Sequence, residues 1–115
     1  MDNETIPLVS SSNSDEEPLF LLSLLNNELM SFSWKLINKE YNIGRSSENS
    51  IILDDITVSR KHALLLVSKE HIKIVDNNST NGIYVNNEIT SDSILKSGDK
   101  IQIGKYLLLL TKVMK

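Results

Sequence analysis

Arg45 and the glycine before it are the first residues that could bind a charged ligand. In the segment "YNIGRSSEN", Ile43 ends a short apolar run and Arg45 follows Gly44 directly. A glycine permits a tight bend or a close approach of another backbone. The planar guanidinium of an arginine at the end of a strand can pair with a carboxylate or a phosphate. Alone, this pattern is also typical of a solvated surface residue.

A second segment, "LDDITVSRKHALLL", contains Ser59 and His62 after Asp54 and Asp55. A serine, a histidine and an acid suggest nucleophilic catalysis, which also requires an oxyanion site and a base within hydrogen-bond reach. The segment contains neither a glycine-rich loop nor a strand–turn–helix pattern, which argues against a hydrolase. The spacing of these aspartates and Asp76 matches no calcium loop. We therefore expect capped loops, no metal, and a half-buried His62 that hydrogen-bonds loop backbone.

The third segment, "DNNSTNGIYVNN", is rich in asparagine. Asparagine side chains stabilise turns by bonding backbone groups two residues on, and glycine suits a positive φ. Turn chemistry accounts for Gly82 and for a set of asparagines, namely Asn77, Asn78, Asn86 and Asn87. It accounts less well for Thr80 and Asn81, because a turn requires no specific pair of a hydroxyl and an amide. These two residues are candidates for binding a ligand.

Short apolar runs separated by Asn, Ser, Asp and Gly clusters predict the elements that position these segments. In "HIKIVD", Ile72 and Ile74 share one face of a strand, and in "KIQIG" Ile101 and Ile103 do the same. The segment "LSLLNNELMSF" could pass for a helical turn, but we interpret it as a hairpin bent at "NNE". About ten such runs, without convincing helical spacing, predict an all-β sandwich or barrel.

The length of 115 residues leaves room for one domain and a tail. Residues 1–18 hold five acidic residues, no Lys or Arg and no apolar periodicity, so we expect a disordered acidic tail. Of the fifteen acidic residues of the chain, ten are left in residues 19–115, against twelve basic ones, which gives a net charge of +2. This surplus is too small to indicate nucleic-acid binding, which favours a clustered basic stripe with interleaved aromatics.

Cysteine is absent from the sequence, which excludes disulfides, thiolate metal sites and cysteine nucleophiles. The longest nearly apolar run, Leu19 to Leu25, is shorter than the roughly 20 residues needed to cross a bilayer. The sequence does not begin with a basic-then-apolar leader. We therefore expect a soluble, cytoplasmic protein.

Three short motifs together carry a family resemblance. They are, in order, Gly44-Arg45, Ser59-x-x-His62, and Asn81-Gly82 followed by Asn86. A tight turn at Gly98 and Asp99, ahead of "KIQIG", comes after them. In this order and spacing the motifs resemble the forkhead-associated (FHA) domain, a β-sandwich that binds phosphothreonine. The resemblance runs from about Leu19 to Val113, so we assign the domain to residues 19–115. It implies about eleven strands, with the peptide bound by loops at one end.

The resemblance implies a role for each motif residue. Arg45 would pair with the phosphate, Ser59 would donate its hydroxyl to a phosphate oxygen, and Arg60 would add charge. Thr80 would support the phosphothreonine pocket, and Asn81 would bond the peptide backbone. The residues that hold the loops would be Gly44, His62, Gly82 and Asn86. The loop before Ser59, "DDITV", has no basic residue, which favours an apolar over an acidic side chain three residues after the phosphothreonine.

The resemblance predicts a phosphothreonine-dependent adaptor in a Ser/Thr kinase pathway. We expect no enzymatic activity, cofactor or metal, because the sequence shows no nucleophile–base pair, metal cluster or glycine-rich phosphate loop. Its partners would be phosphothreonine-containing proteins, either a Ser/Thr kinase or its substrates, and not nucleic acid or membranes. The expected state is a monomer. Thr5, in "NETIPL", is a candidate phosphosite through which the tail would occupy the domain's own pocket, as in some bacterial members. The alternative function is an assembly domain that keeps the fold and binds its partner without phosphate.

Overall fold

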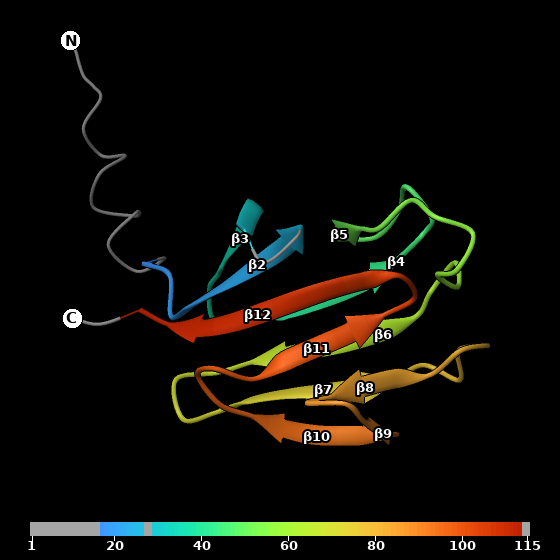
Figure 1. Ribbon diagram of the computed structural model, residues 1–115. Helices are drawn as coiled ribbons and strands as arrows, with labels where there is room; N and C mark the ends of the chain where they lie inside the picture. The colour runs from blue at the N-terminus through green and yellow to red at the C-terminus, as the bar shows by residue number, and fades with distance from the viewer. Residues whose placement is uncertain (1–16, 27–28, 114–115) are drawn as a thin grey trace, which may run out of the picture.

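The chain folds into two packed β-sheets, as the computed structural model of residues 17–26 and 29–113 shows (Figure 1). The described residues form eleven strands and no helix, so they contain no helix that could cross a membrane. The strands are β2 (Phe20–Asn26), β3 (Leu29–Leu36), β4 (Glu40–Gly44), β5 (Ile51–Ile52), β6 (Ala63–Val67), β7 (Ile72–Asp76), β8 (Ile83–Val85), β9 (Glu88–Thr90), β10 (Asp92–Leu95), β11 (Lys100–Ile103) and β12 (Tyr106–Lys112).

The two sheets have six and five strands. The order is β3-β2-β12-β11-β8-β9 in the larger sheet and β10-β7-β6-β4-β5 in the smaller one. All neighbouring strands pair antiparallel except β4 and β5, which are parallel. The predicted all-β sandwich is confirmed.

Alternating side chains build the core between the sheets. Ile72 and Ile74 of β7 are buried, as are Ile101 and Ile103 of β11, whereas their neighbours along each strand are more exposed. Each of these isoleucines contributes about 1.5–3 kcal/mol by leaving water. The alternation in the sequence therefore predicted correctly which side chains of β7 and β11 face the core.

The β2–β3 pair confirms the predicted hairpin. Phe20 lies opposite Leu36, and the register continues to Leu24 opposite Phe32, after which it shifts. The expected bend, "NNE", includes residues 27 and 28, which lie outside the described residues. Most of the expected tail, residues 1–16 with Thr5, also lies outside them.

The turns use the residues that the sequence indicated. Gly82 and Gly98 have φ angles of 78° and 98°, and Asn86 and Asn87 have φ angles of 51° and 73°. Glycine occupies this left-handed region without steric cost, and asparagine tolerates it better than most residues. At the predicted Gly98–Asp99 turn, the buried Asp99 carboxylate accepts the N–H of Lys96 at 2.8 Å.

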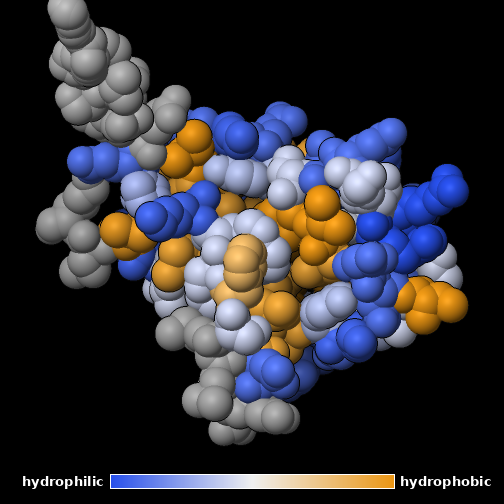
Figure 2. Space-filling view, turned by 90° about the horizontal axis from the view of Figure 1, so that it is seen from above, coloured by the Kyte–Doolittle hydropathy of each residue, from blue (hydrophilic) through white to orange (hydrophobic). Residues whose placement is uncertain are grey.

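The loops after β4, β5, β7 and β11 gather at one end of the sandwich, on the right of Figure 1. The edge strands β3 and β5 lie along the upper side of the sandwich in Figure 1. Seen from above, hydrophobic side chains lie in the middle of this side and hydrophilic ones surround much of it (Figure 2). The loop end is the place where residues from distant parts of the sequence can form a polar site.

Candidate functional site

Arg45 is fixed at the loop end by two hydrogen bonds. Its main-chain N–H donates to the carbonyl of Ser59 at 3.0 Å, and its Nε donates to the carbonyl of Val58 at 3.0 Å. The side chain is exposed and lines a depression of about 450 Å³. The other residues lining the depression are Ser46, Glu48, Asp54, Arg60 and Lys61. The Arg45 guanidinium is therefore fixed by a hydrogen bond and faces an open surface, which also carries the cationic side chains of Arg60 and Lys61.

Gly44 allows the loop after β5 to pack directly on the end of β4. A Cβ atom at this position would lie 2.2 Å from the carbonyl oxygen of Arg60. The buried Asn49 secures the same contact, because its Nδ2 donates to the carbonyls of Ser46 and Arg60, each at 2.8 Å. This role of Asn49 could not be predicted from sequence, because Asn49 resembles any other polar loop residue in "RSSENS".

Ser59 connects the three motifs through its main chain and side chain. Its hydroxyl accepts the N–H of Thr80 at 3.0 Å, 21 residues away in the sequence. Its own N–H donates to His62 Nδ1 at 3.0 Å, and its carbonyl accepts the N–H of Arg45. The hydroxyl proton is not used in the bond to Thr80, so it is available to a ligand oxygen.

His62 is completely buried, at 0% exposure, which corrects the expectation of a half-buried imidazole. Its Nδ1 accepts the N–H of Ser59, so the ring proton resides on Nε2, which donates to the carbonyl of Gly82 at 2.7 Å. The predicted bonding to loop backbone is confirmed. Burial is greater than expected because His62 lies between two loops, one residue before β6 begins at Ala63.

Asn81 is exposed at the tip of the β7–β8 loop. Its Nδ2 donates to the carbonyl of Thr57 at 2.9 Å, across 24 residues of sequence. The N–H of Gly82 donates to Ser79 Oγ at 2.9 Å, and Ser79 is bonded in turn to the Asp76 carboxylate. Asn81 thus protrudes from a closed turn. Thr80 is also exposed, and its N–H orients Ser59.

Asn86 stabilises a different turn. Its Nδ2 donates to the carboxylate of Asp99, and its Oδ1 accepts the N–H of Lys100, each at 3.0 Å. These bonds tie the β8–β9 turn to the start of β11. Asn86 therefore stabilises the β8–β9 turn and does not line the depression beside Arg45.

Asp55 and Asp76 are engaged within the protein. Asp55 accepts the N–H and the hydroxyl of Thr57 and pairs with Lys105 at 3.2 Å. Asp76 accepts from Ser79. Within residues 17–26 and 29–113, no three His, Cys, Asp or Glu side chains form a group that could hold a metal. The contact of Thr57 with Lys105 could not be predicted from sequence, because 48 residues separate them.

Comparison with known proteins decides the family. The sequence profile of the FHA domain matches residues 41–104, more than half of the chain. The chain belongs to the FHA domain family. A curated relative, the oxoglutarate dehydrogenase inhibitor of Corynebacterium efficiens, is 48% identical over 65 residues, which are 56% of this chain and 46% of the relative. The chain thus matches less than half of the length of that relative.

Solved FHA domains have the same architecture. One comes from a structural and functional analysis of phosphothreonine-dependent FHA domain interactions; it is 27% identical, with a TM-score of 0.78 over 84% of this chain and 99% of that one. A further similar structure is that of Mycobacterium tuberculosis EmbR in complex with a low-affinity phosphopeptide. It is 26% identical, with a TM-score of 0.76 over 93% of this chain and 29% of that one. Together with the inhibitor relative, these likenesses indicate a binding or regulatory protein.

Proposed function

We propose that this FHA domain binds phosphothreonine peptides and acts as an adaptor in Ser/Thr kinase signalling. The observation that supports this most directly is the convergence of Arg45, Ser59 and Asn81. All three are held by bonds to residues 57–59 or to the adjoining loops, and Arg45 and Asn81 remain exposed. A solved structure from a study of phosphothreonine-dependent FHA domain interactions, and a similar structure with a phosphopeptide bound, support the same ligand class.

The proposed roles follow from the available donors. A phosphothreonine carries about −1.5 to −2 charges and three strong acceptor oxygens. The Arg45 guanidinium has N–H groups beyond the Nε bond to Val58, and these would pair with phosphate oxygens. The Ser59 hydroxyl would donate to another oxygen. Arg60, exposed in the same depression, would add positive charge.

Asn81 would bind the peptide backbone. Its Nδ2 already holds one donor bond to Thr57, which leaves a second amide hydrogen and the amide oxygen for a peptide main chain. Thr80 would support the site through its N–H bond to Ser59. Gly44, His62, Gly82 and Asn86 would hold the loops without touching the ligand.

Calorimetry with a degenerate phosphothreonine peptide library, followed by single peptides, tests the proposal. We expect micromolar dissociation constants for the wild type, corresponding to about −8 kcal/mol. Arg45→Ala should weaken binding at least about tenfold, because charge-assisted hydrogen bonds contribute about 1.5–3 kcal/mol each. The control is Lys100→Ala, which also removes one positive charge. Lys100 is the first residue of β11, at the end of the strand opposite the β11–β12 turn, so this variant should leave binding unchanged.

The same titrations decide between phosphate reading and phosphate-independent assembly. An adaptor should bind the phosphothreonine peptide. It should bind the phosphoserine form of the same peptide more weakly, and it should not bind the unphosphorylated form. Equal affinity of the wild type and Arg45→Ala for every peptide would reject phosphate reading and favour an assembly domain that keeps the fold.

We further propose that residues 19–115 form the domain. It would act as a monomer in the cytoplasm. It would bind neither nucleic acid nor a cofactor and would have no enzymatic activity. The strands run from Phe20 to Lys112, which supports the domain limits. Light scattering of the purified chain tests the monomer, and a fluorescent fusion in cells tests the location.

A further inference from the structure

Two neighbouring carbonyls hold the two side chains proposed to grip the peptide. The carbonyl of Thr57 accepts Asn81 Nδ2 at 2.9 Å, and the carbonyl of Val58 accepts Arg45 Nε at 3.0 Å. Ser59, the next residue, supplies the hydroxyl of the site. Residues 57–59, which we call the central segment, therefore determine where all three ligand-binding groups lie.

Asp55 fixes the beginning of the central segment. Its Oδ2 accepts the hydroxyl of Thr57 at 2.6 Å and the N–H of Thr57 at 2.9 Å. The turn is closed further by the N–H of Val58, which donates to the carbonyl of Asp55 at 3.0 Å. The hydroxyl bond with Thr57 is the main reason why the pKa of Asp55 is lowered to about 2 from an ordinary 3.8. Asp55 is thus a charged acceptor throughout the physiological pH range.

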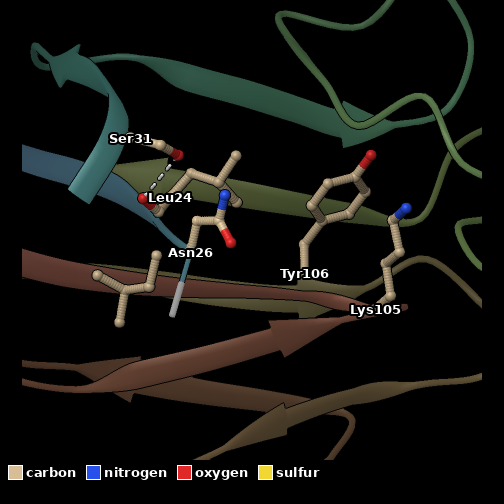
Figure 3. A pocket seen from close by; sticks show the side chains of 6 residues that line it. Leu24, Asn26, Ser31, Lys105 and Tyr106 are labelled. Carbon is tan, nitrogen blue, oxygen red and sulfur yellow. Dashed lines mark hydrogen bonds between the residues drawn. The ribbon is translucent and has the colours of Figure 1, made fainter. Parts of the chain in front are cut away.

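The β11–β12 turn holds the other side of Thr57. The N–H of Lys105 donates to Thr57 Oγ1 at 2.9 Å, and Lys105 Nζ lies 3.2 Å from Asp55 Oδ1. Gly104 makes this approach possible: a Cβ there would lie 2.5 Å from Thr57 Oγ1, and its φ is +59°. The Lys105 side chain also lines a neighbouring cavity with Tyr106 (Figure 3). The β11–β12 turn is therefore a third loop bonded to the central segment, after the loops of Arg45 and Asn81.

We propose that Asp55 and Thr57 are positioning residues, whose network with Lys105 places Asn81 and Arg45 for ligand binding and so determines the affinity of the site. This inference rests on the proposed phosphopeptide function. Neither residue needs to touch the ligand. Their effect passes through the carbonyls of Thr57 and Val58, which accept the hydrogen bonds of the two ligand-binding side chains.

The sign of the effect separates positioning from a simple charge effect. Removal of the negative charge of Asp55 would, by Coulomb attraction alone, strengthen the binding of an anionic phosphate. Loss of the Thr57 anchor predicts weaker binding instead. Asp54 offers a matched control, because it is the adjacent acid, is exposed, and lines the depression with Arg45. Asp54→Asn removes the same charge without disturbing Thr57.

The binding test uses the full chain and a phosphothreonine peptide selected on the wild type from a degenerate library. Asp55→Asn and Thr57→Val, which is close to isosteric, should each weaken binding about tenfold, a loss of about 1.4 kcal/mol. Thr57→Ser keeps the hydroxyl and should restore nearly all of the affinity. Asp54→Asn should raise the affinity, because it removes a negative charge from the depression that would hold the phosphate. Unchanged affinity in both Asp55→Asn and Thr57→Val would overturn the inference.

A ligand-free measurement keeps the inference testable if the wild type binds no phosphothreonine peptide, which would contradict the proposed function alone. In ¹H–¹⁵N spectra of the free chain, Thr57→Val should shift the Asn81 side-chain amide and the Arg45 Nε–H resonances and speed their exchange with water. Thr57→Ser should keep both near their wild-type positions. Wild-type resonances in Thr57→Val would show that the network does not position these groups.

Discussion

The Nε2 atom of His62 lies 2.7 Å from the carbonyl oxygen of Gly82, 20 residues further along the chain. The other ring nitrogen accepts the N–H of Ser59, so one buried imidazole joins the loops that carry Ser59 and Asn81. The ring must therefore keep its proton on Nε2. His62 is thus a structural connector between two loops.

Replacement of His62 should destabilise the domain. His62→Ala leaves the Ser59 N–H and the Gly82 carbonyl without their partner, at about 1–3 kcal/mol for each buried group left unpaired. Thermal unfolding should show a clearly lower Tm. The matched control is His71→Ala, since the side chain of His71 is exposed and its described bonds to Ser68 use the main chain. Equal melting temperatures for the two variants would refute the connecting role.

Addition of one methyl group at Gly44 should disturb the site more than a comparable change elsewhere. In Gly44→Ala the new Cβ would meet the carbonyl of Arg60, so the loop after β5 must move. Both Tm and phosphopeptide affinity should fall. Gly98→Ala serves for comparison, because a Cβ there has no atom within 4 Å and only its φ of +98° is unfavourable. Gly98→Ala should lower Tm and leave affinity unchanged.

The Asp55 carboxylate predicts a pH dependence of stability. Its pKa is lowered to about 2 in the folded chain, chiefly by the hydroxyl of Thr57, from an ordinary value of 3.8. The stabilisation it gives is therefore present in full above pH 3.8 and is lost as the pH falls towards 2. Urea unfolding at pH 5 and pH 2.5 should show a smaller loss of stability on acidification for Asp55→Asn than for the wild type. An equal loss in both chains would exclude Asp55 as a contributor.

Ile56 should influence the choice of peptide. It is 90% exposed in the loop before Ser59, beside the Asp55–Thr57 network. Ile56→Asp should reduce the preference for an apolar residue three after the phosphothreonine, because the apolar contact is replaced by a carboxylate. Tm should stay constant, since an exposed side chain gives up little burial. A peptide array measures the preference, and Ile89→Asp, on β9 and 65% exposed, is the control.

Thr5 offers a test of self-regulation. If phosphorylated Thr5 occupies the domain's own site, a chain with phosphothreonine at this position should bind an external phosphopeptide more weakly than the unmodified chain. Titration at two concentrations of the chain separates binding within one molecule from binding between molecules. Undiminished affinity for the external peptide would remove this hypothesis.

The strands and the motifs could be read from local patterns. Alternation at Ile72 and Ile74 indicated the inward face of β7, and turn chemistry indicated the positive φ of Gly82 and the bend at Asn86 and Asn87. These features depend on residues within a few positions of each other. For the same reason, the segment "LSLLNNELMSF" could be interpreted as the β2–β3 hairpin, although it also resembles a helical turn.

The sequence by itself determined the two-sheet fold, the order of the motifs and the candidates Arg45, Ser59 and Asn81. Only the tertiary structure decided how they are held, because the contacts join residues 13 to 48 positions apart. Asn49 is buried because Gly44 has no side chain, and Thr57 is anchored because the β11–β12 turn packs beside it. Such packing follows from the folded chain and has no local pattern in sequence.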